Sequence, residues 1–512
     1  MSDYSRRQFL HDSLLAAAAA GAAGPVGKLF GAEASTATSI TERGPNEKLR
    51  FAVCGLHGQG SSHVTNLLND LNKGEADIVA ICDVDEHVGQ AKCDELANKT
   101  GNRPKFYQDV RKLLENKDID CVSAAVPNHW HALLAIWAMQ AGKDVYTEKP
   151  AAHNMFECQR MVETARAHKR ICQIGTQSRS NPGTIDAIQF IRDGKIGEVN
   201  LARGICFKER MSIGPAGEYQ VPANIDYNLW RGPAPMAATS PYPGKPGRGG
   251  GARVPVHYDW HWNWLFGNGD LGNQGVHEMD VANWGLGVAE LAKGVITYGG
   301  RFGYTDAGET PNTEVTVLDF GPKTLVFEMH GLTNAPFKKL KGVDIGIVFE
   351  GSQGYVAMTS YTNGAAFDKD GKTIQRFSGG KYEMHHANFI KAVRSRSPED
   401  LNCDVAKGAL SANLVHMANI SYRLGQPTPT AEVLKRLEAV KMSDNAKEVL
   451  DRTVAHLAEN KVQIDDDKTV FQCGQYLAFD PKSQTFPGNA KANELMTREY
   501  RKGFEVPAAG KV

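Results

Sequence analysis

The sequence lacks a net charge, a cysteine framework and a long apolar run. Lys plus Arg and Asp plus Glu number 58 each, so no overall field attracts nucleic acid or an anionic membrane. The nine cysteines are odd in number and scattered, which excludes a disulfide scaffold and predicts small core residues. No segment approaches the roughly 20 uninterrupted apolar residues of a membrane-spanning helix. We therefore expect no nucleic-acid partner and no stable membrane insertion.

What is present describes a globular protein with ample core. Apolar residues make up 41% of the 512 residues and charged residues 23%. A chain of this length is too long for one ordinary domain, so two domains with an extension are expected. The 52 glycines predict many tight turns or close approaches of backbone to ligand.

The N-terminal residues have the features of an export signal. Ser5 to Leu10 reads S-R-R-Q-F-L, which resembles a twin-arginine signal, and a weakly apolar run follows from residue 14 to residue 23. Ala32-Glu33-Ala34 offers a small-residue cleavage site. We predict a signal peptide over residues 1–34, a polar linker over 35–48, and a periplasmic or other extracytoplasmic location. The alternative is a chance Arg-Arg pair before an Ala-rich helix.

Residues 49–83 have the order of a dinucleotide-binding unit. An apolar strand over 49–54 leads into a glycine turn, a helical pattern over 61–71 follows, and a second apolar strand over 77–82 ends at Asp83. Glycines permit close approach to a pyrophosphate, and the helix N-terminus attracts that anion. The residues predicted to bind the cofactor in this turn are Gly55, His57, Gly58, Gln59 and Gly60.

Asp83 indicates which dinucleotide is bound. Its carboxylate would accept hydrogen bonds from ribose hydroxyls and repel a 2′-phosphate, which favours NAD over NADP. The glycine spacing is G-x-x-G-x-G and not the commoner G-x-G-x-x-G, so an ordinary α/β turn is the alternative.

The rest of the chain divides into three parts. Strands and helices alternate to residue 175, which predicts a doubly wound parallel sheet over 49–175. An α+β domain with a mostly antiparallel sheet is predicted over 176–400, and a helical C-terminal region with an extension over 401–512. The expected strands of the second sheet are residues 199–206, 293–298, 314–320, 325–330 and 343–350. The expected helices near the C-terminus are residues 384–396, 408–424 and 431–457.

Residues 143–150 read K-D-V-Y-T-E-K-P and place an acid–base pair at the end of a strand. Glu148 and Lys149 follow a short β-branched and aromatic stretch, and Pro150 ends the strand because proline cannot donate to a sheet ladder. Ligands of open α/β sheets bind at the carboxyl ends of the strands. A solvated charge pair before a turn is the alternative interpretation.

With the glycine turn, the E-K-P sequence resembles the Gfo/Idh/MocA family of sugar and cyclitol oxidoreductases. Two further features occur in the family's order: the Pro127-x-x-x-His131 loop, and residues 269–284, which read G-D-L-G-N-Q-G-V-H-E-M-D-V-A-N-W. The resemblance covers most of the chain after the signal. It implies hydride transfer between a nicotinamide and a secondary alcohol of a sugar type. It also implies that the cofactor is contacted by Pro127, Asn128, His131, Glu148 and Lys149.

The resemblance further implies the catalytic residues. Lys149 would lie between nicotinamide and substrate and bind the reacting oxygen, and His277 would be the acid–base residue. A carbinol carbon gives up hydride only if its O–H proton also leaves, so a base within hydrogen-bond reach is required. A cation beside the oxygen stabilises the developing alkoxide. By itself, a histidine on such a helix is more often a hydrogen-bonded core residue.

The segment around His277 has two features of its own. On a helix over 275–285, His277, Asp280 and Trp284 would share one face. Asp280 would then either orient the imidazole or contact substrate hydroxyls. Family dehydrogenases often carry aspartate four residues before the histidine, whereas this chain has Asn273, which cannot take a proton. Asn273 is therefore expected to contact substrate, with His277 acting alone or in a different reaction.

Residues 222–264 are rich in glycine, proline and aromatic side chains. Trp260 and Trp262 alternate, so on an extended chain they would share a face and could pack against sugar rings. Packing of these tryptophans within their own domain, or across an oligomer interface, is an equal alternative. Gln177, where the first domain passes into the second, is predicted to line the same cleft.

The sequence leaves three functional hypotheses. The leading one is an exported, NAD-dependent oxidoreductase of a sugar, glycoside or cyclitol, assembled as a dimer or tetramer. The second is a glycosidase that retains NAD and uses it transiently, and the third is a non-catalytic carbohydrate-binding relative. No metal site is expected, because His385, His386 and His416 have no companions at ligand spacing.

Overall fold

The computed structural model describes residues 47–69, 72, 74–215, 221–235, 255–440, 442–465 and 469–512. These all fall within one unit, Arg43–Val512. The predicted signal peptide, and the predicted linker except for Glu47 and Lys48, lie outside the described residues. Within them, no helix has the length and apolar character that crossing a membrane requires.

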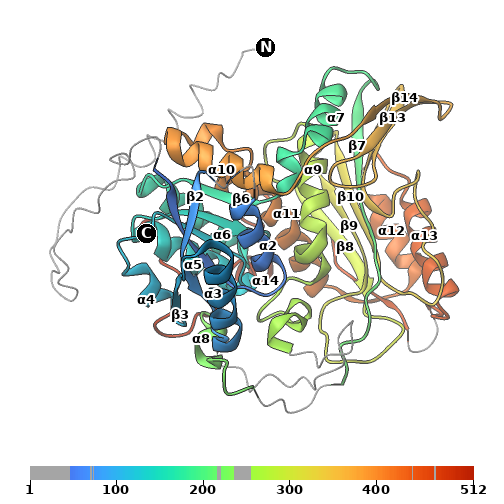
Figure 1. Ribbon diagram of the computed structural model, residues 1–512. Helices are drawn as coiled ribbons and strands as arrows, with labels where there is room; N and C mark the ends of the chain where they lie inside the picture. The colour runs from blue at the N-terminus through green and yellow to red at the C-terminus, as the bar shows by residue number, and fades with distance from the viewer. Residues whose placement is uncertain are drawn as a thin grey trace, which may run out of the picture. The chain divides into compact units, whose positions relative to one another are not determined.

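Six parallel strands form the first sheet, as predicted (Figure 1). Their spatial order, β3-β2-β1-β4-β5-β6, is that of a doubly wound dinucleotide-binding sheet, whose ligands bind where the order reverses. The point of reversal here lies between β1 and β4. The strands are β1 Leu49–Cys54, β2 Ala76–Cys82, β3 Lys105–Tyr107, β4 Cys121–Ala124, β5 Asp144–Glu148 and β6 Cys172–Gly175. The helices between them are α2 Gln59–Leu68, α3 Glu86–Thr100, α4 Val110–Leu114, α5 Asn128–Gln140 and α6 Met155–Ala167.

The second sheet has eleven strands in the described residues and is mostly antiparallel, also as predicted. Only β7 and β10 pair in parallel. The five strands expected from the sequence are present as β7 Val199–Phe207, β8 Gly294–Gly300, β9 Thr313–Asp319, β10 Thr324–His330 and β11 Ile345–Gly351. The sheet has six further strands: β12 Gly354–Met358, β13 Gly364–Asp368, β14 Thr373–Phe377, β15 Gln426–Thr428, β16 Phe471–Cys473 and β17 Leu477–Ala478.

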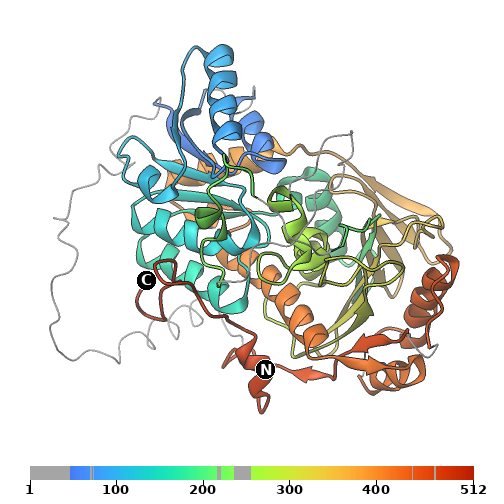
Figure 2. The same ribbon diagram turned by 90° about the horizontal axis from the view of Figure 1, so that it is seen from below.

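Helices cover both faces of the second sheet (Figures 1 and 2). The helices packed on one face are α7 Pro182–Arg192, α9 Val276–Leu286 and α11 Val405–Arg423, which share a buried apolar cluster with Phe327 and Phe349 of the sheet. Those packed on the other face are α12 Thr430–Ala439 and α13 Ala446–Glu459. Alternate residues of a strand point to opposite faces, and strands β7 to β10 accordingly contribute to both clusters. The remaining helices are α8 Tyr227–Arg231, α10 Glu383–Ser395 and α14 Ala490–Glu494.

The C-terminal residues are built into the second sheet. The single helix expected over 431–457 is wrong, because α12 ends at Ala439 and a new helix begins at Ala446. Asn445 starts that second helix, since its side chain accepts hydrogen bonds from the backbone N–H groups of Lys447 and Glu448. The tail then returns to the first sheet's core, where Phe504 packs edge-on against Trp130.

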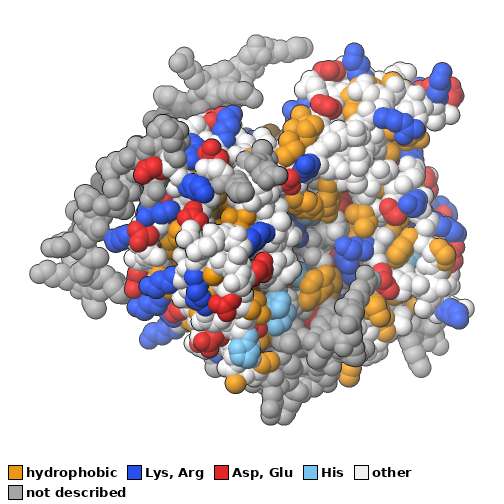
Figure 3. Space-filling view, in the orientation of Figure 1, with side chains coloured by type: hydrophobic (Ala, Val, Ile, Leu, Met, Phe, Trp, Pro, Cys, Tyr) orange, Lys and Arg blue, Asp and Glu red, His pale blue; other side chains and the backbone are white. Residues whose placement is uncertain are grey.

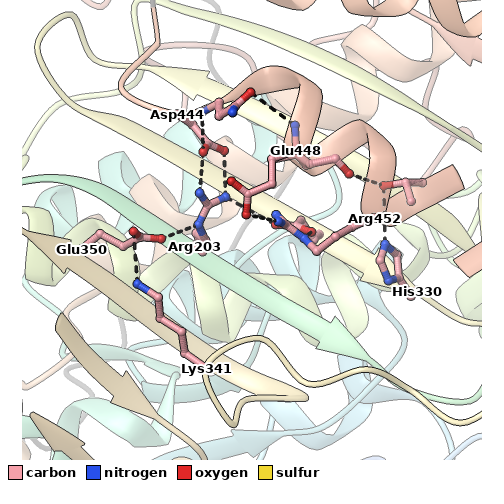
Figure 4. A network of polar contacts seen from close by, with 11 residues as sticks. Arg203, His330, Lys341, Glu350, Asp444, Glu448 and Arg452 are labelled. Atoms are coloured by element: carbon pink, nitrogen blue, oxygen red, sulfur yellow. Dashed lines mark hydrogen bonds and ion pairs between the residues drawn. The ribbon is translucent and has the colours of Figure 1, made fainter. Parts of the chain in front are cut away.

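A buried charge network fastens α13 to the second sheet (Figure 4). Arg203 of β7 donates to Glu350 of β11 at 2.7 Å and to Asp444, just before α13. Arg452 of α13 donates to Glu328 of β10 at 2.8 Å. Because the Arg203 side chain is only 5% exposed, water cannot replace its partners.

Truncating the Arg203 side chain should therefore lower the stability of the protein. Arg203→Ala leaves buried carboxylates without their counter-charge, and we expect it to lower the free energy of unfolding by about 3–5 kcal/mol. The matched control is Lys338→Ala, which removes an exposed pair with Glu459 and should cost less than about 1 kcal/mol. Urea denaturation of the three proteins measures the difference, and equal midpoints for the two variants would show that the network contributes nothing.

Candidate functional site

A cavity of about 680 Å³ runs from the glycine turn to the second sheet. Its walls include the turn after β1, the ends of β2 and β5, the start of α5, and residues from the segment 225–277. Figure 3 shows the hollow on this face, with hydrophobic, basic and histidine side chains around it. The cavity therefore joins the predicted cofactor residues to the predicted catalytic residues.

The glycine turn is shaped for close approach of a ligand. Gly55 has φ +77°, and a Cβ on Gly60 would lie 1.7 Å from the Gly55 carbonyl oxygen, so neither position accepts a side chain. Gly58, with φ +53°, faces open space. Helix α2 begins immediately afterwards with no side-chain cap, which leaves its first N–H groups to an anion.

Asp83 closes the dinucleotide-binding unit at the end of β2. Its two carboxylate oxygens accept hydrogen bonds from the backbone N–H groups of Leu56 and Asp85, at 2.8 and 2.9 Å. Burial is the main cause that raises the pKa of Asp83 to about 6, against the effect of those bonds. The carboxylate is therefore fixed in orientation, mostly ionised at neutral pH, and still has lone pairs for ribose hydroxyls.

Glu148 is the centre of a buried hydrogen-bond network. Its Oε1 accepts from Gln177 Nε2 at 2.8 Å and from Gln59 Nε2 at 3.3 Å, and lies 3.1 Å from His63 Nε2. Burial alone would raise the pKa of Glu148, but the His63 hydrogen bond and the Lys149 charge outweigh it and lower the pKa to about 2. A permanently charged carboxylate thus connects helix α2, strand β5 and the turn after β6.

Lys149 extends from this network toward the second sheet. Its Nζ donates to the backbone carbonyl of Asn273 at 2.7 Å. That carbonyl belongs to a π-helical turn, Leu271–Gly275, which leads directly into α9. Such turns recur at functional sites. Burial is the main cause that lowers the pKa of Lys149, and Glu148 opposes it.

His277, on the first turn of α9, lines the same end of the cavity. It is 6% exposed, and its Nδ1 is buried without a hydrogen-bond partner among the described residues. Burial, followed by the Lys149 charge, lowers the pKa of His277 to about 3, so the ring is neutral at neutral pH. A neutral imidazole with an unused nitrogen can accept a proton.

Comparison with known proteins agrees with this geometry. A family model for the GFO_IDH_MocA oxidoreductases, described as an oxidoreductase family with an NAD-binding Rossmann fold, matches residues 49–176. Residues 49–176 therefore belong to the NAD-binding domain of the Gfo/Idh/MocA oxidoreductases. The match confirms the predicted family resemblance and the cofactor class.

The curated relatives match about a third of the chain. Inositol 2-dehydrogenase from Salmonella typhimurium is 31% identical over 178 residues, 35% of this chain. Glycosyl hydrolase family 109 protein 1 from Shewanella sp. strain MR-4 is 28% identical over 157 residues, 30% of this chain and 34% of its own length. The chain spans half the length of the inositol 2-dehydrogenase.

A solved structure shows the two-domain fold. WlbA dehydrogenase from Bordetella pertussis, crystallised with NADH and UDP-GlcNAcA, superposes with a TM-score of 0.54 at 20% identity. The match covers 74% of this chain and 97% of that one. The likeness therefore extends across both sheets, although at this identity it concerns the fold alone.

Most of the residues predicted from the Gfo/Idh/MocA pattern lie around the cavity. The lining residues are Gly55, His57, Gly58, Gln59, Asp83, Pro127, Asn128, His131, Glu148, Lys149, Gln177, Trp260, Asn273 and His277. Gly60 does not line it, because its place against Gly55 is structural. Both ring nitrogens of His131 already lie against backbone carbonyls, Nδ1 at 2.6 Å from that of Pro150 and Nε2 at 2.8 Å from that of Val126.

Two predicted residues lie elsewhere. Asp280 is fully buried away from His277, where it accepts from Arg179 Nε at 2.8 Å and from Ser411 Oγ at 2.6 Å. Trp262 packs on Ile213 outside the cavity. The assumed extended chain is wrong, because Asp259–Trp262 forms a 3₁₀ turn and directs neighbouring tryptophans differently. Asp280 and Trp262 therefore have structural positions.

Several residues of the site were not foreseen. His63 bridges Glu148 and Ser123, and Gly175 leaves room for the carboxylate, since a Cβ there would lie 2.7 Å from Glu148 Oε1. Tyr361, after β12, has its ring 4.9 Å from that of His277. Glu278 is fully buried, and burial raises its pKa to about 8. Of these residues, only His63 could have been suspected from the sequence, because it is a polar residue on the helix that follows the glycine turn.

The protonation of His277 can be measured directly. With a pKa near 3, the imidazole should remain neutral from pH 8 down to pH 5 in nuclear magnetic resonance spectra of histidine-labelled protein. His277→Gln assigns the signal. Lys149→Met removes a positive neighbour and should therefore raise the pKa of His277. A wild-type signal that titrates close to pH 6.5 would contradict this description of the site.

Proposed function

We propose that this protein is an NAD-dependent oxidoreductase that acts on a secondary hydroxyl of a sugar, glycoside or cyclitol. The observation that carries the proposal is that Lys149 and His277 both line the cavity that begins at the glycine turn. The resemblance to inositol 2-dehydrogenase supports this class of substrate.

The cavity residues fit a dinucleotide. The glycine turn and the uncapped α2 N-terminus suit its phosphates, and Asp83 suits the ribose hydroxyls and disfavours the 2′-phosphate of NADP. When bound, NAD supplies a nicotinamide ring that accepts or returns hydride. Glu148 and Asn128 line the same side of the cavity and would orient the cofactor.

Lys149 and His277 have complementary tasks at the substrate hydroxyl. The Lys149 ammonium, held by the Asn273 carbonyl, would bind the hydroxyl oxygen and stabilise negative charge on it. The His277 imidazole would take the hydroxyl proton during oxidation and return it during reduction. Because Lys149 contacts the backbone of Asn273, a carboxylate at that position is not needed to hold it.

The remaining lining suits a polyhydroxylated ring. Tyr361, Trp260 and Tyr258 offer aromatic faces for C–H groups, while Lys208 offers a donor for hydroxyl oxygens. We place substrate recognition in this part of the cavity.

A glycosidase that retains NAD is the second candidate. It is favoured by the similarity to a glycosyl hydrolase family 109 protein and by Tyr361 beside His277, which gives a second group able to exchange protons. Release of aglycone from a glycoside without net formation of NADH would select this reaction.

We further propose a periplasmic or other extracytoplasmic location and a homo-oligomeric assembly. The location is supported by the Arg6-Arg7 pair and by Ala32 to Ala34. Twin-arginine export carries folded proteins, so NAD could be acquired before export.

Replacing either catalytic residue should separate chemistry from cofactor binding. Lys149→Ala and His277→Ala are each expected to lower kcat/KM by about 10²- to 10⁴-fold, because each removes a charge or proton contact to the reacting oxygen. NAD binding, measured by calorimetry, should persist in both variants. The assay follows the NADH absorbance band with a panel of sugars and cyclitols, with Lys338→Ala as the surface control. Full activity in both variants would refute these assignments.

A further inference from the structure

Three possible metal ligands meet at the edge of the cavity, beside the glycine turn. His57 belongs to that turn, Asp85 follows β2, and His257 ends the 3₁₀ turn Pro255–His257. One ligand atom from each lies within 4.8 Å of the others. Because the three residues come from segments far apart in the sequence, their spacing gave no sign of a metal site.

Asp85 is a buried carboxylate whose one ion-pair partner among the described residues is a histidine, His257. It is 3% exposed, and among the described residues no Lys or Arg forms an ion pair with it. Its Oδ1 accepts from Asn224 Nδ2 at 2.7 Å and from the Val88 N–H at 3.3 Å. Its Oδ2 lies 3.1 Å from His257 Nε2. A carboxylate removed from water needs a compensating charge, and two imidazoles beside it can share a cation.

We propose that His57, Asp85 and His257 bind a divalent cation of the zinc class. Two imidazoles and one carboxylate are ligands that Zn²⁺ prefers. The 3.1 Å separation of His257 Nε2 and Asp85 Oδ2 is close to the ~3.3 Å edge of a tetrahedron with metal–ligand bonds of about 2.0–2.1 Å. The Asn224 side chain donates a hydrogen bond to the other carboxylate oxygen of Asp85. Hydrogen bonds of this kind commonly orient a carboxylate that binds a metal.

The site would join two parts of the chain. The segment around Ile225 already pairs with Asp85 through a β-bridge, and the Glu86 N–H donates to the Asn224 carbonyl at 2.9 Å. The His57 and His257 rings are stacked, with their centroids 3.8 Å apart. A cation here would link the glycine turn to the aromatic segment that covers it. All three residues line the cavity, so a cation held by them would lie at its edge.

Metal binding by the full chain tests the proposal without NAD or substrate. After treatment with a chelator, calorimetric titration with Zn²⁺ should show one equivalent per chain. Titration with Co²⁺ should give visible absorption bands of a low-symmetry, four-coordinate site. His57→Ala, Asp85→Asn and His257→Ala should each abolish the stoichiometric binding. Asn224→Ala should weaken it roughly 10- to 100-fold.

The matched control is His261→Ala, which removes another histidine of the same segment, one that stacks on Trp260 outside the cluster. This variant should bind one equivalent as tightly as the wild type. The wild-type Co²⁺ spectrum answers the question even if a ligand variant does not fold. Absence of stoichiometric binding to the wild type, or unchanged binding in all three ligand variants, would overturn the proposal. These experiments measure metal binding alone. Neither result therefore bears on the oxidoreductase proposal, which is tested separately by the activity assays.

Discussion

The buried carboxylate of Glu148 is hydrogen-bonded by side chains of two separate segments, and the arrangement of the cavity depends on them. Gln59 and His63 come from the helix after the glycine turn, and Gln177 comes from the turn where the chain leaves the first sheet. The residue after Glu148 is Lys149, so the network that holds the cofactor turn also sets the direction of the lysine. The low pKa of Glu148 keeps its carboxylate charged at neutral pH. One charged group thus positions both the predicted cofactor residues and the Lys149 ammonium.

The second sheet provides the other half of the site through one helix. Helix α9 packs on the sheet through a cluster that includes Phe327 and Phe349, and the π-helical turn before it presents the carbonyl of Asn273 to Lys149. Asp280, on the buried side of that helix, is fixed by Arg179 near the point where the two sheets connect. Helices α12 and α13 cover the opposite face, where Arg203 holds the start of α13. The site is therefore supported by a sheet that is buried on both faces.

Local patterns predicted the first half of the site and missed much of the second. The glycine turn, Asp83 and Glu148-Lys149 occur in short segments whose chemistry is visible in the sequence. The role of Asp280 was inferred from helical spacing, which places it on one face with His277 but does not reveal that Arg179 and Ser411 occupy it. Trp260 and Trp262 alternate in sequence, yet a 3₁₀ turn separates their directions. Tyr361 reaches the site through strands that the sequence pattern did not indicate. Contacts between segments that are distant in the sequence determine the positions of these residues, and local patterns do not reveal such contacts.

The most direct test of this account is the NAD affinity of Glu148→Gln, measured by calorimetry on protein with a wild-type circular dichroism spectrum. The substitution keeps the shape of the side chain but replaces the charge with an amide, one of whose ends must face the donors of Gln59, His63 and Gln177. If the carboxylate organises the cofactor turn, the dissociation constant should rise at least about tenfold, a loss of about 1.4 kcal/mol. Wild-type affinity together with wild-type turnover would contradict the central role assigned to Glu148.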